Sequence, residues 1–245
     1  MNYITGDVHG NIDIHKFNSN NFPHGKNLRK DDYIIVCGDF GLVWDNNDQE
    51  LYWREWLLEK PWTTLFVCGN HENFNLLNNL PQVKMFEGVV GKVTDSIFHL
   101  KRGEIYNIYG ETFFCMGGAY SVDKSSRIEG ISWWKEEIPS SQEFNHGLDN
   151  LEKHNFKVDY IVGHTGPSSI IAKYIHEKGL DLFIEAERLD TVSKYFESLL
   201  DRVEFKKFYM GHFHDDYTID NKFVVLYNEI IPVGDNSQYP IQKIN

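Results

Sequence analysis

The chain has 245 residues, of which 41% are hydrophobic, and this predicts one compact domain over residues 1–245 with a sizeable core. A formal net charge of -12 argues against a broad nucleic-acid-binding surface, because such a surface needs clustered Lys and Arg. No apolar run reaches about 18 residues and no leader pattern precedes the first apolar segment, so we expect a cytoplasmic protein without a membrane span.

Strands are predicted where short apolar runs rich in Ile, Val and Leu occur. The clearest are residues 31–39, 63–70 and 158–164, with the sequences DDYIIVCGD, TTLFVCGN and VDYIVGH. Continuous apolar runs are typical of strands buried on both faces, in a sheet that helices cover. The cysteines lie inside apolar runs without CxxC spacing, so we expect Cys37, Cys68 and Cys115 to be reduced core thiols.

Helices are predicted between and after these strands. The apolar face of a helix over residues 48–60 is expected to hold Tyr52, Trp53, Trp56 and Leu57. A second helix should begin at Ser140, where Glu143 completes a plausible capping box. A third is expected over residues 187–200, with an apolar face of Leu189, Val192, Phe196 and Leu199.

Two regions have a different pattern. Residues 83–116 and 206–233 contain short strand-like pieces, such as TFFCM and KFVVLYNEII, which suggest hairpins more than crossover units. No internal repeat and no linker rich in Pro, Gly or Ser interrupts the chain. The pattern as a whole favours a single α/β domain with two sheets.

One pattern occurs five times: an apolar run, a glycine, and then a residue that can bind a metal ion. The five pairs are Gly6-Asp7, Gly38-Asp39, Gly69-Asn70, Gly163-His164 and Gly211-His212. In open α/β sheets, ligands bind beyond the carboxyl ends of strands, and a glycine there permits sharp turns and close backbone approach. Five strands are thus expected to deliver side chains to one edge.

Two of the five sites add a histidine two residues further on, His9 after Asp7 and His214 after His212. The combined set of two Asp, one Asn and four His suits Mn, Fe, Zn or Ni better than Ca or Mg, which prefer oxygen ligands alone. Seven candidate ligands exceed what one tetrahedral site requires. The set therefore favours two transition-metal ions with one carboxylate between them.

Each member of the set has an ordinary explanation when it is taken alone. A lone His after a strand is more often a surface or core residue than a ligand, and Asp after Gly is usually a turn residue or a helix cap. His212 and His214 alone could belong to an alternating edge strand. The occurrence of five such signals at five predicted strand ends favours the metal site.

The motifs GDVHG, GDFG, GNHE, GHTGP and GHFH occur in this order over residues 6–214, and they resemble those of the calcineurin-like metallophosphoesterases. The resemblance implies a four-layer α/β/β/α sandwich of two mixed sheets, with a dinuclear centre at its edge. It also implies hydrolysis of a phosphomonoester or phosphodiester, with a metal-bridging hydroxide as the nucleophile.

Residue roles follow from the same resemblance. It places Asp7, His9 and His214 on one metal, and Asn70, His164 and His212 on the other, with Asp39 between the two. His71 would face the substrate, stabilising the phosphoryl group and protonating the leaving oxygen. Glu72 is expected to orient the site from behind its imidazoles.

The second motif departs from the family pattern, which commonly reads Gly-Asp-x-x-Asp. Leu42 occupies the last position, whose Asp often orients the catalytic His. Asp45 is one candidate to replace it and could equally be a solvated loop residue. Val43 stands where the protein Ser/Thr phosphatase branch carries Arg, which weakens an identity as a phosphoprotein phosphatase.

The segment GGAYSVDKSSR, residues 117–127, supplies two further cations. Lys124 and Arg127 could hold a substrate phosphate or lie on a solvated surface turn. Trp133 and Trp134 follow, and a core position is favoured over a platform for a ring.

The sequence thus predicts an enzyme that acts on a phosphate ester. The acidic charge mildly favours a small substrate over a long polyanion. The alternative is a non-catalytic binding scaffold on the same fold, which would be expected to lack His71 or one of the ligands.

Overall fold

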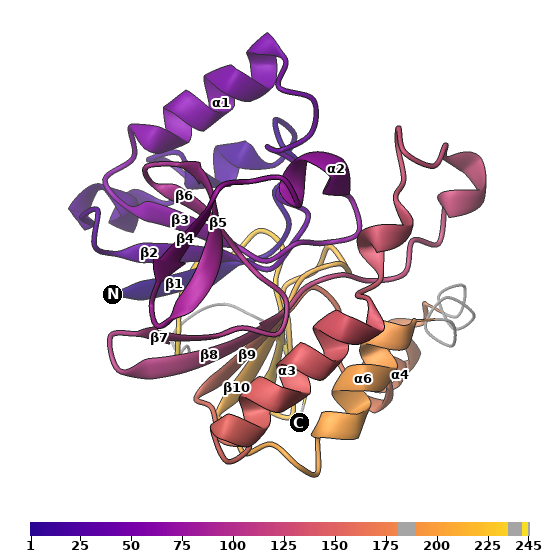
Figure 1. Ribbon diagram of the computed structural model, residues 1–245. Coiled ribbons are helices and arrows are strands. Elements are labelled where there is room, and N and C mark those ends of the chain that lie inside the picture. Colours follow the sequence, from indigo (N-terminus) through magenta and orange to yellow (C-terminus); the bar gives the residue numbers. More distant parts are fainter. Residues whose placement is uncertain (181–189, 235–241, 245) are drawn as a thin grey trace.

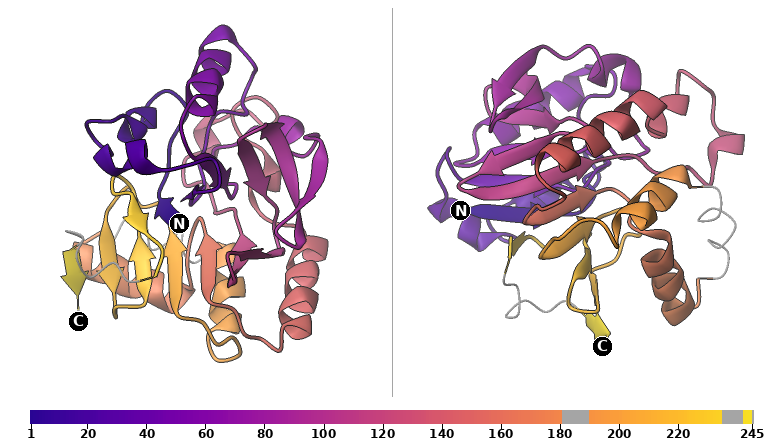
Figure 2. Two further views of the ribbon diagram at one scale, coloured as in Figure 1. Left: turned by 90° about the vertical axis from the view of Figure 1, so that its left-hand side faces the viewer. Right: turned by 60° about the horizontal axis from the view of Figure 1, so that its bottom comes forward.

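The computed structural model describes residues 1–180, 190–234 and 242–244. Two seven-stranded sheets face each other, and helices cover their outer faces (Figure 1). Views from two other directions show the same layering (Figure 2). The predicted four-layer arrangement of two mixed sheets is confirmed.

The first sheet has the strand order β13-β1-β2-β3-β6-β5-β4. Its central strands β1, β2, β3 and β6 run parallel, whereas β13, β5 and β4 are antiparallel to their neighbours. The strands are β1 (Asn2–Thr5), β2 (Tyr33–Val36), β3 (Thr63–Phe66), β4 (Gln82–Met85), β5 (Gly88–Thr94), β6 (Ile97–Leu100) and β13 (Ile231–Pro232).

The second sheet has the order β14-β11-β12-β10-β9-β8-β7. Strands β8, β9, β10 and β12 run parallel to one another, and β7 and β11 are antiparallel to β8 and β12. The strands are β7 (Ile105–Ile108), β8 (Glu111–Met116), β9 (Tyr160–Gly163), β10 (Lys207–Met210), β11 (Tyr217–Ile219), β12 (Phe223–Val225) and β14 (Gln242–Ile244).

Three hydrophobic clusters fill the spaces between the four layers. One lies between the sheets and includes Leu65 and Val162. A second joins the first sheet to helix α1 (Asp48–Leu58), and a third joins the second sheet to α3 (Ser141–Lys153), α4 (Ser168–Lys178) and α6 (Thr191–Leu199). The short elements are α2 (Phe74–Leu77), η1 (Ile14–Phe17), η2 (Pro23–Asn27), η3 (Lys124–Ser126) and η4 (Lys135–Glu137).

The helix starts follow local capping chemistry. Ser140 and Glu143 form the predicted capping box at the start of α3. The Asp190 side chain caps α6, whose Val192, Phe196 and Leu199 are buried as expected, while Leu189 lies outside the described residues. In α1 the expected apolar face is wrong at one position: Leu57 is buried, but Tyr52 is 59% exposed.

The hairpin prediction is confirmed for residues 83–116 and needs correction for 206–233. Strands β10 and β12 are parallel neighbours, and the hairpin there is formed by β11 and β12 instead. Ile231–Pro232 leaves the second sheet and pairs with β1 in the first. The run KFVVLYNEII therefore connects the two sheets, because it begins in β12 of the second sheet and ends in β13 of the first.

All three cysteines are buried free thiols, as predicted. Trp134 belongs to the core beside α1, which is also the predicted use. No helix among the described residues is long and apolar enough to cross a membrane.

Candidate metal centre

The polar residues that follow β1, β2, β3, β9 and β10 meet at one edge of the two sheets. One ligand atom each from Asp7, His9 and His214 lie within 4.8 Å of one another, and the same holds for Asp7, Asp39 and His164. Asn70 Oδ1 lies 2.9 Å from His164 Nε2, and the ring of His212 is centred 4.9 Å from that of His164. The structure thus brings all seven candidates together.

Close approach between the motifs depends on their glycines. A Cβ atom on Gly69 would lie 1.9 Å from Asp39 Oδ1, and one on Gly211 would lie 2.1 Å from Asp7 Oδ1. Any side chain at either position would displace a carboxylate that belongs to another motif. The glycine of one motif therefore makes room for the ligand of the next, which explains their pairing in the sequence.

Four of the seven residues have left-handed backbone conformations. Their φ angles are 46° for His9 and Asp39, 71° for His212 and 49° for His214. Such conformations cost about 1–3 kcal/mol each and persist only where the surroundings hold them. Here the His9 amide donates to the Asp39 carbonyl oxygen at 2.7 Å, and the His212 amide donates to Asp7 Oδ1 at 2.9 Å.

A backbone contact fixes the ring of His164. Its Nδ1 lies 2.7 Å from the Cys37 carbonyl oxygen, which can only accept, so Nδ1 carries the proton of this bond. Nε2 then faces Asn70 Oδ1 at 2.9 Å and Asp39 Oδ1 at 3.4 Å. This is the orientation that a metal-ligating histidine needs.

A second hydrogen-bond network fixes the ring of His9, and it was not predicted from the sequence. His9 Nδ1 lies 2.7 Å from Asp13 Oδ2, which leaves Nε2 directed at Asp39 Oδ2 at 3.4 Å. The Tyr227 hydroxyl donates to Asp13 Oδ1 at 3.0 Å, and the Tyr227 ring stacks on His214 with 4.8 Å between centroids. Asp13 and Tyr227 therefore position two candidate ligands at once.

A third network fixes the amide of Asn70 and was also missed. Asn70 Nδ2 donates to Ser121 Oγ at 3.0 Å, so that its Oδ1 faces the cluster. Ser121 in turn donates to Glu137 Oε2 at 2.5 Å, and all three side chains are buried. Segment 117–127 is thus connected to the centre through Ser121 and not through Lys124 or Arg127, the residues of this segment that were predicted to act.

The negative charges of Asp7 and Asp39 make the cluster suitable for bound cations. Burial would lower the pKa of His9 and His164, yet Asp39 and Asp7 raise both to about 9. Without cations, protons on these rings offset the buried carboxylates. Burial and the neighbouring His164 lower the pKa of His212 to about 3, which keeps this ring in the neutral form that binds metals. Among the described groups, buried Asp7 Oδ2 has no hydrogen bond of good geometry, although His214 Nε2 lies 3.2 Å away.

Glu72 is buried behind the cluster, and its carboxylate accepts hydrogen bonds from backbone amides and not from imidazoles. It accepts from the Phe40 amide at 2.9 Å, and the Gly69 and Gly41 amides are 3.4 and 3.5 Å away. Burial, with Asp39 nearby, raises the pKa of Glu72 to about 7. This carboxyl group supports the two loops that carry Asp39 and Asn70, so any orienting role of Glu72 would act through the backbone and not through an imidazole.

Asp45 is a turn residue. Both of its carboxylate oxygens accept from Asn47, at 3.0 and 2.9 Å. Burial lowers the pKa of His71, and the carboxylates that oppose this effect are Asp39 and Asp123. Both oxygens of Asp45 thus accept from Asn47 within the turn, and the replacement of the missing Asp at position 42 by Asp45 stays a prediction.

The two loop cations point in different directions. The Lys124 ammonium lies 3.8 Å from the centre of the Tyr120 ring, while Arg127 pairs with Asp123 at 2.7 Å and donates to the Ser132 carbonyl oxygen. Asp123 lines a cleft of about 360 Å³ together with Asp39, Asn70, His71 and His212. Arg127 is thus connected to this cleft by its ion pair with Asp123, whereas Lys124 packs on the ring of Tyr120.

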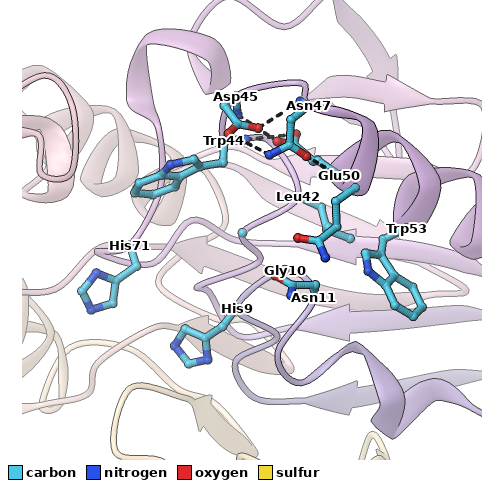
Figure 3. Close-up of a pocket in the computed structure, with 12 residues that line it drawn as sticks. His9, Gly10, Asn11, Leu42, Trp44, Asp45, Asn47, Glu50, Trp53 and His71 are labelled. Atoms are coloured by element: carbon cyan, nitrogen blue, oxygen red, sulfur yellow. Dashed lines mark hydrogen bonds between the residues drawn. The ribbon is translucent and has the colours of Figure 1, made fainter.

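A smaller cavity of about 240 Å³ adjoins the cluster on the side of His9 and His71 (Figure 3). Trp44 and Trp53 stand on opposite sides of it, with Asn11 between them. The two cavities share His71 in their linings.

Comparisons with known proteins agree with this geometry. A family model described as calcineurin-like phosphoesterase matches residues 3–216. The lariat debranching enzyme of Schizosaccharomyces pombe is 26% identical over 215 residues, which cover 78% of this chain and 44% of the relative. The chain therefore spans less than half the length of this curated relative.

Proposed function

Because this chain belongs to the calcineurin-like phosphoesterase family, we propose that it hydrolyses a phosphomonoester or phosphodiester at the seven-residue cluster. Membership confirms the family resemblance predicted from the five motifs. The observation that carries the proposal is the convergence of Asp7, Asp39 and His164, whose ligand atoms lie within 4.8 Å of one another.

We assign Asp7, His9 and His214 to one metal ion, Asn70, His164 and His212 to a second, and Asp39 to both. Its position supports this assignment, since Asp39 Oδ2 is 3.4 Å from His9 Nε2 and Oδ1 is 3.4 Å from His164 Nε2. When bound, two such ions would activate water and neutralise phosphoryl charge. Mn, Fe, Zn or Ni remains the prediction from the donor set.

The chain's own residues hold the ligand atoms in place before the substrate arrives. The Cys37 carbonyl oxygen fixes the tautomer of His164, Asp13 fixes that of His9, and Ser121 fixes the amide of Asn70. Pre-oriented ligands do not have to reorganise during the reaction, which is a main source of catalysis by electrostatic stabilisation.

We assign to His71 the contact with the leaving oxygen of the substrate. Its ring is half-buried at the boundary of the two cavities, and its amide donates to Asp39 Oδ1 at 2.8 Å. Burial lowers the pKa of this histidine in the free protein. A bound phosphate would raise this pKa again, because an opposite charge nearby favours the protonated ring.

A non-catalytic scaffold remains the alternative, and the side chains disfavour it. A scaffold has no need for the three hydrogen-bond networks that orient His164, His9 and Asn70, and forming each network costs conformational entropy because it orders polar side chains. The activity of the relative on lariats does not transfer to this chain at 26% identity and 44% coverage. A cytoplasmic location also stays a prediction.

Metal-reconstituted protein should hydrolyse nitrophenyl phosphate or bis-nitrophenyl phosphate and lose this activity to a chelator. The matched variant is Asp39→Asn, which keeps the shape of the side chain and removes its charge. It should reduce activity more than His9→Ala, since Asp39 alone faces both groups of ligands. A protein that binds two ions and hydrolyses neither ester would favour the scaffold.

A further inference from the structure

Aromatic contacts hold both tryptophans that flank the cavity. The Trp44 ring meets Trp134 edge-on, with 5.2 Å between centroids. Trp53 meets His15 in the same way at 5.1 Å. Both tryptophans are half-buried, so each is anchored in the core and still has surface on the cavity. Figure 3 shows them on opposite sides, with Gly10 and Asn11 between them.

Glu50 holds the loop that carries Trp44. This buried carboxylate accepts from the amides of Trp44 at 3.0 Å, Asp45 at 2.8 Å and Asn46 at 3.0 Å, and it pairs with Arg54. Arg54 also donates to the Leu42 carbonyl oxygen, which keeps its guanidinium within the loop. The Arg54 guanidinium is therefore already bonded within the loop, and the Glu50 charge is offset.

The remaining lining groups select what can enter. Buried Leu42 adds an apolar contact, and the exposed amide side chains of Asn11 and Gln49 offer donors and acceptors. Within the described residues, the lining contains the carboxylates of Asp45 and Glu50 but no Lys or Arg. A second phosphate would meet the Asp45 carboxylate here and no Lys or Arg among the described lining residues, whereas an uncharged ring with a polar edge would find stacking surface and hydrogen-bonding partners.

Size and position restrict the occupant further. At about 240 Å³ the cavity is smaller than the roughly 300–1,000 Å³ of sites that hold whole drug-sized ligands, so it suits one ring system. His9 and His71 close the end that adjoins the cluster, and their ring centroids are 6.3 Å apart. A group bound in the cavity can thus be joined to a phosphate at the cluster.

We propose that this cavity binds the uncharged heteroaromatic ring of the substrate, a nucleobase, so that the substrate is a nucleotide phosphoester. The proposal rests on the proposed function for the phosphate and names the group attached to it. Trp44 and Trp53 supply the stacking surface, and Asn11 and Gln49 face the polar edge of the base.

Adenosine is the probe that separates this proposal from catalysis, because it carries no phosphate. Saturation-transfer NMR on chelator-treated protein should show stronger transfer to the base protons than to the ribose protons. Trp53→Leu should weaken adenosine binding about 5- to 150-fold, since stacking on an aromatic side chain is worth about 1–3 kcal/mol per base. Ribose 5-phosphate, which has no base, should give no signal from this cavity.

Trp56→Leu is the matched control. Trp56 lies on the same helix and is also half-buried against the core, but it does not line the cavity. Gln49→Ala adds a variant that removes no core packing, because Gln49 is exposed in the first turn of α1. It should weaken adenosine binding while leaving the unfolding midpoint unchanged.

Two outcomes would overturn the proposal: no transfer to the base protons in the wild type, or equal weakening by Trp53→Leu and Trp56→Leu. A ribose 5-phosphate signal that Trp53→Leu abolishes would overturn it as well, since the cavity would then hold the sugar. If the proposed phosphoesterase function is wrong, the result is different. The metal-loaded protein would then hydrolyse no phosphoester, while adenosine would still bind to the cavity.

Discussion

Asp13 Oδ2 lies 2.7 Å from His9 Nδ1, four residues earlier in the chain, and this contact directs the other ring nitrogen toward Asp39. Carboxylates behind ligating imidazoles fix the ring and raise its basicity. Asp13 stands outside the five motifs, although it controls a residue inside one of them.

Asp13→Ala should therefore weaken metal binding about 10- to 100-fold, because His9 loses the partner that holds its ring. Calorimetric titration of the metal-free protein with Mn²⁺ measures this directly. Asp31→Ala removes an exposed carboxylate on the same half of the chain and should leave the affinity unchanged. Equal affinities for all three proteins would show that Asp13 does not position His9.

Gly69→Ala should abolish metal binding at the centre. The new methyl group would lie 1.9 Å from Asp39 Oδ1 and would displace that carboxylate. Gly110→Ala is the control: Gly110 has φ of 82° and nothing within 4 Å of the added atom. This control should lose about 1–2 kcal/mol of stability to its left-handed backbone and keep its metal. Full metal content in Gly69→Ala would contradict the interlocking of the motifs.

Ser121→Ala should cost about 1–3 kcal/mol in the free energy of unfolding, because it leaves the buried Glu137 carboxyl group without its hydroxyl partner. It should also lower the affinity of the site that includes Asn70, whose amide becomes free to rotate. Urea unfolding and metal titration measure the two effects. Ser126→Ala, an exposed change in the same segment, should show neither. Loss of stability with normal metal affinity would confine Ser121 to a packing role.

His71→Ala should slow the hydrolysis of alkyl phosphate esters about 10²- to 10⁴-fold more than that of nitrophenyl esters. An alkoxide needs a proton to leave, whereas nitrophenolate departs without one. Relative kcat values for the two ester types measure this bias, and metal content should not change. Equal slowing of both types would assign His71 to stabilising phosphoryl charge and not to proton donation.

The sequence was sufficient for the seven candidate ligands because each follows a strand directly, and parallel strands end at the same edge. Tyr227, Ser121 and Glu137 were not predictable, since loops bring them to the site from distant positions. Asp13 lies only four residues from His9, but a single loop carboxylate at that distance does not reveal its partner. The same limit applied to residues 206–233, where neighbours in sequence were expected to pair but β10 pairs with β12. The role of Asp45 could not be decided from the sequence, because a loop carboxylate can accept from its own turn as readily as from a histidine.

Asp7 follows a strand of the first sheet, and His214 follows a strand of the second. A cation held by both is therefore a non-covalent cross-link between the two halves of the sandwich. Such a link closes a loop that includes most of the chain, and it does so only after both sheets have formed. Ligand binding to the folded state alone raises stability in proportion to the logarithm of free ligand concentration. The concentration of free metal would then set the stability of the folded chain as well as the activity of its site.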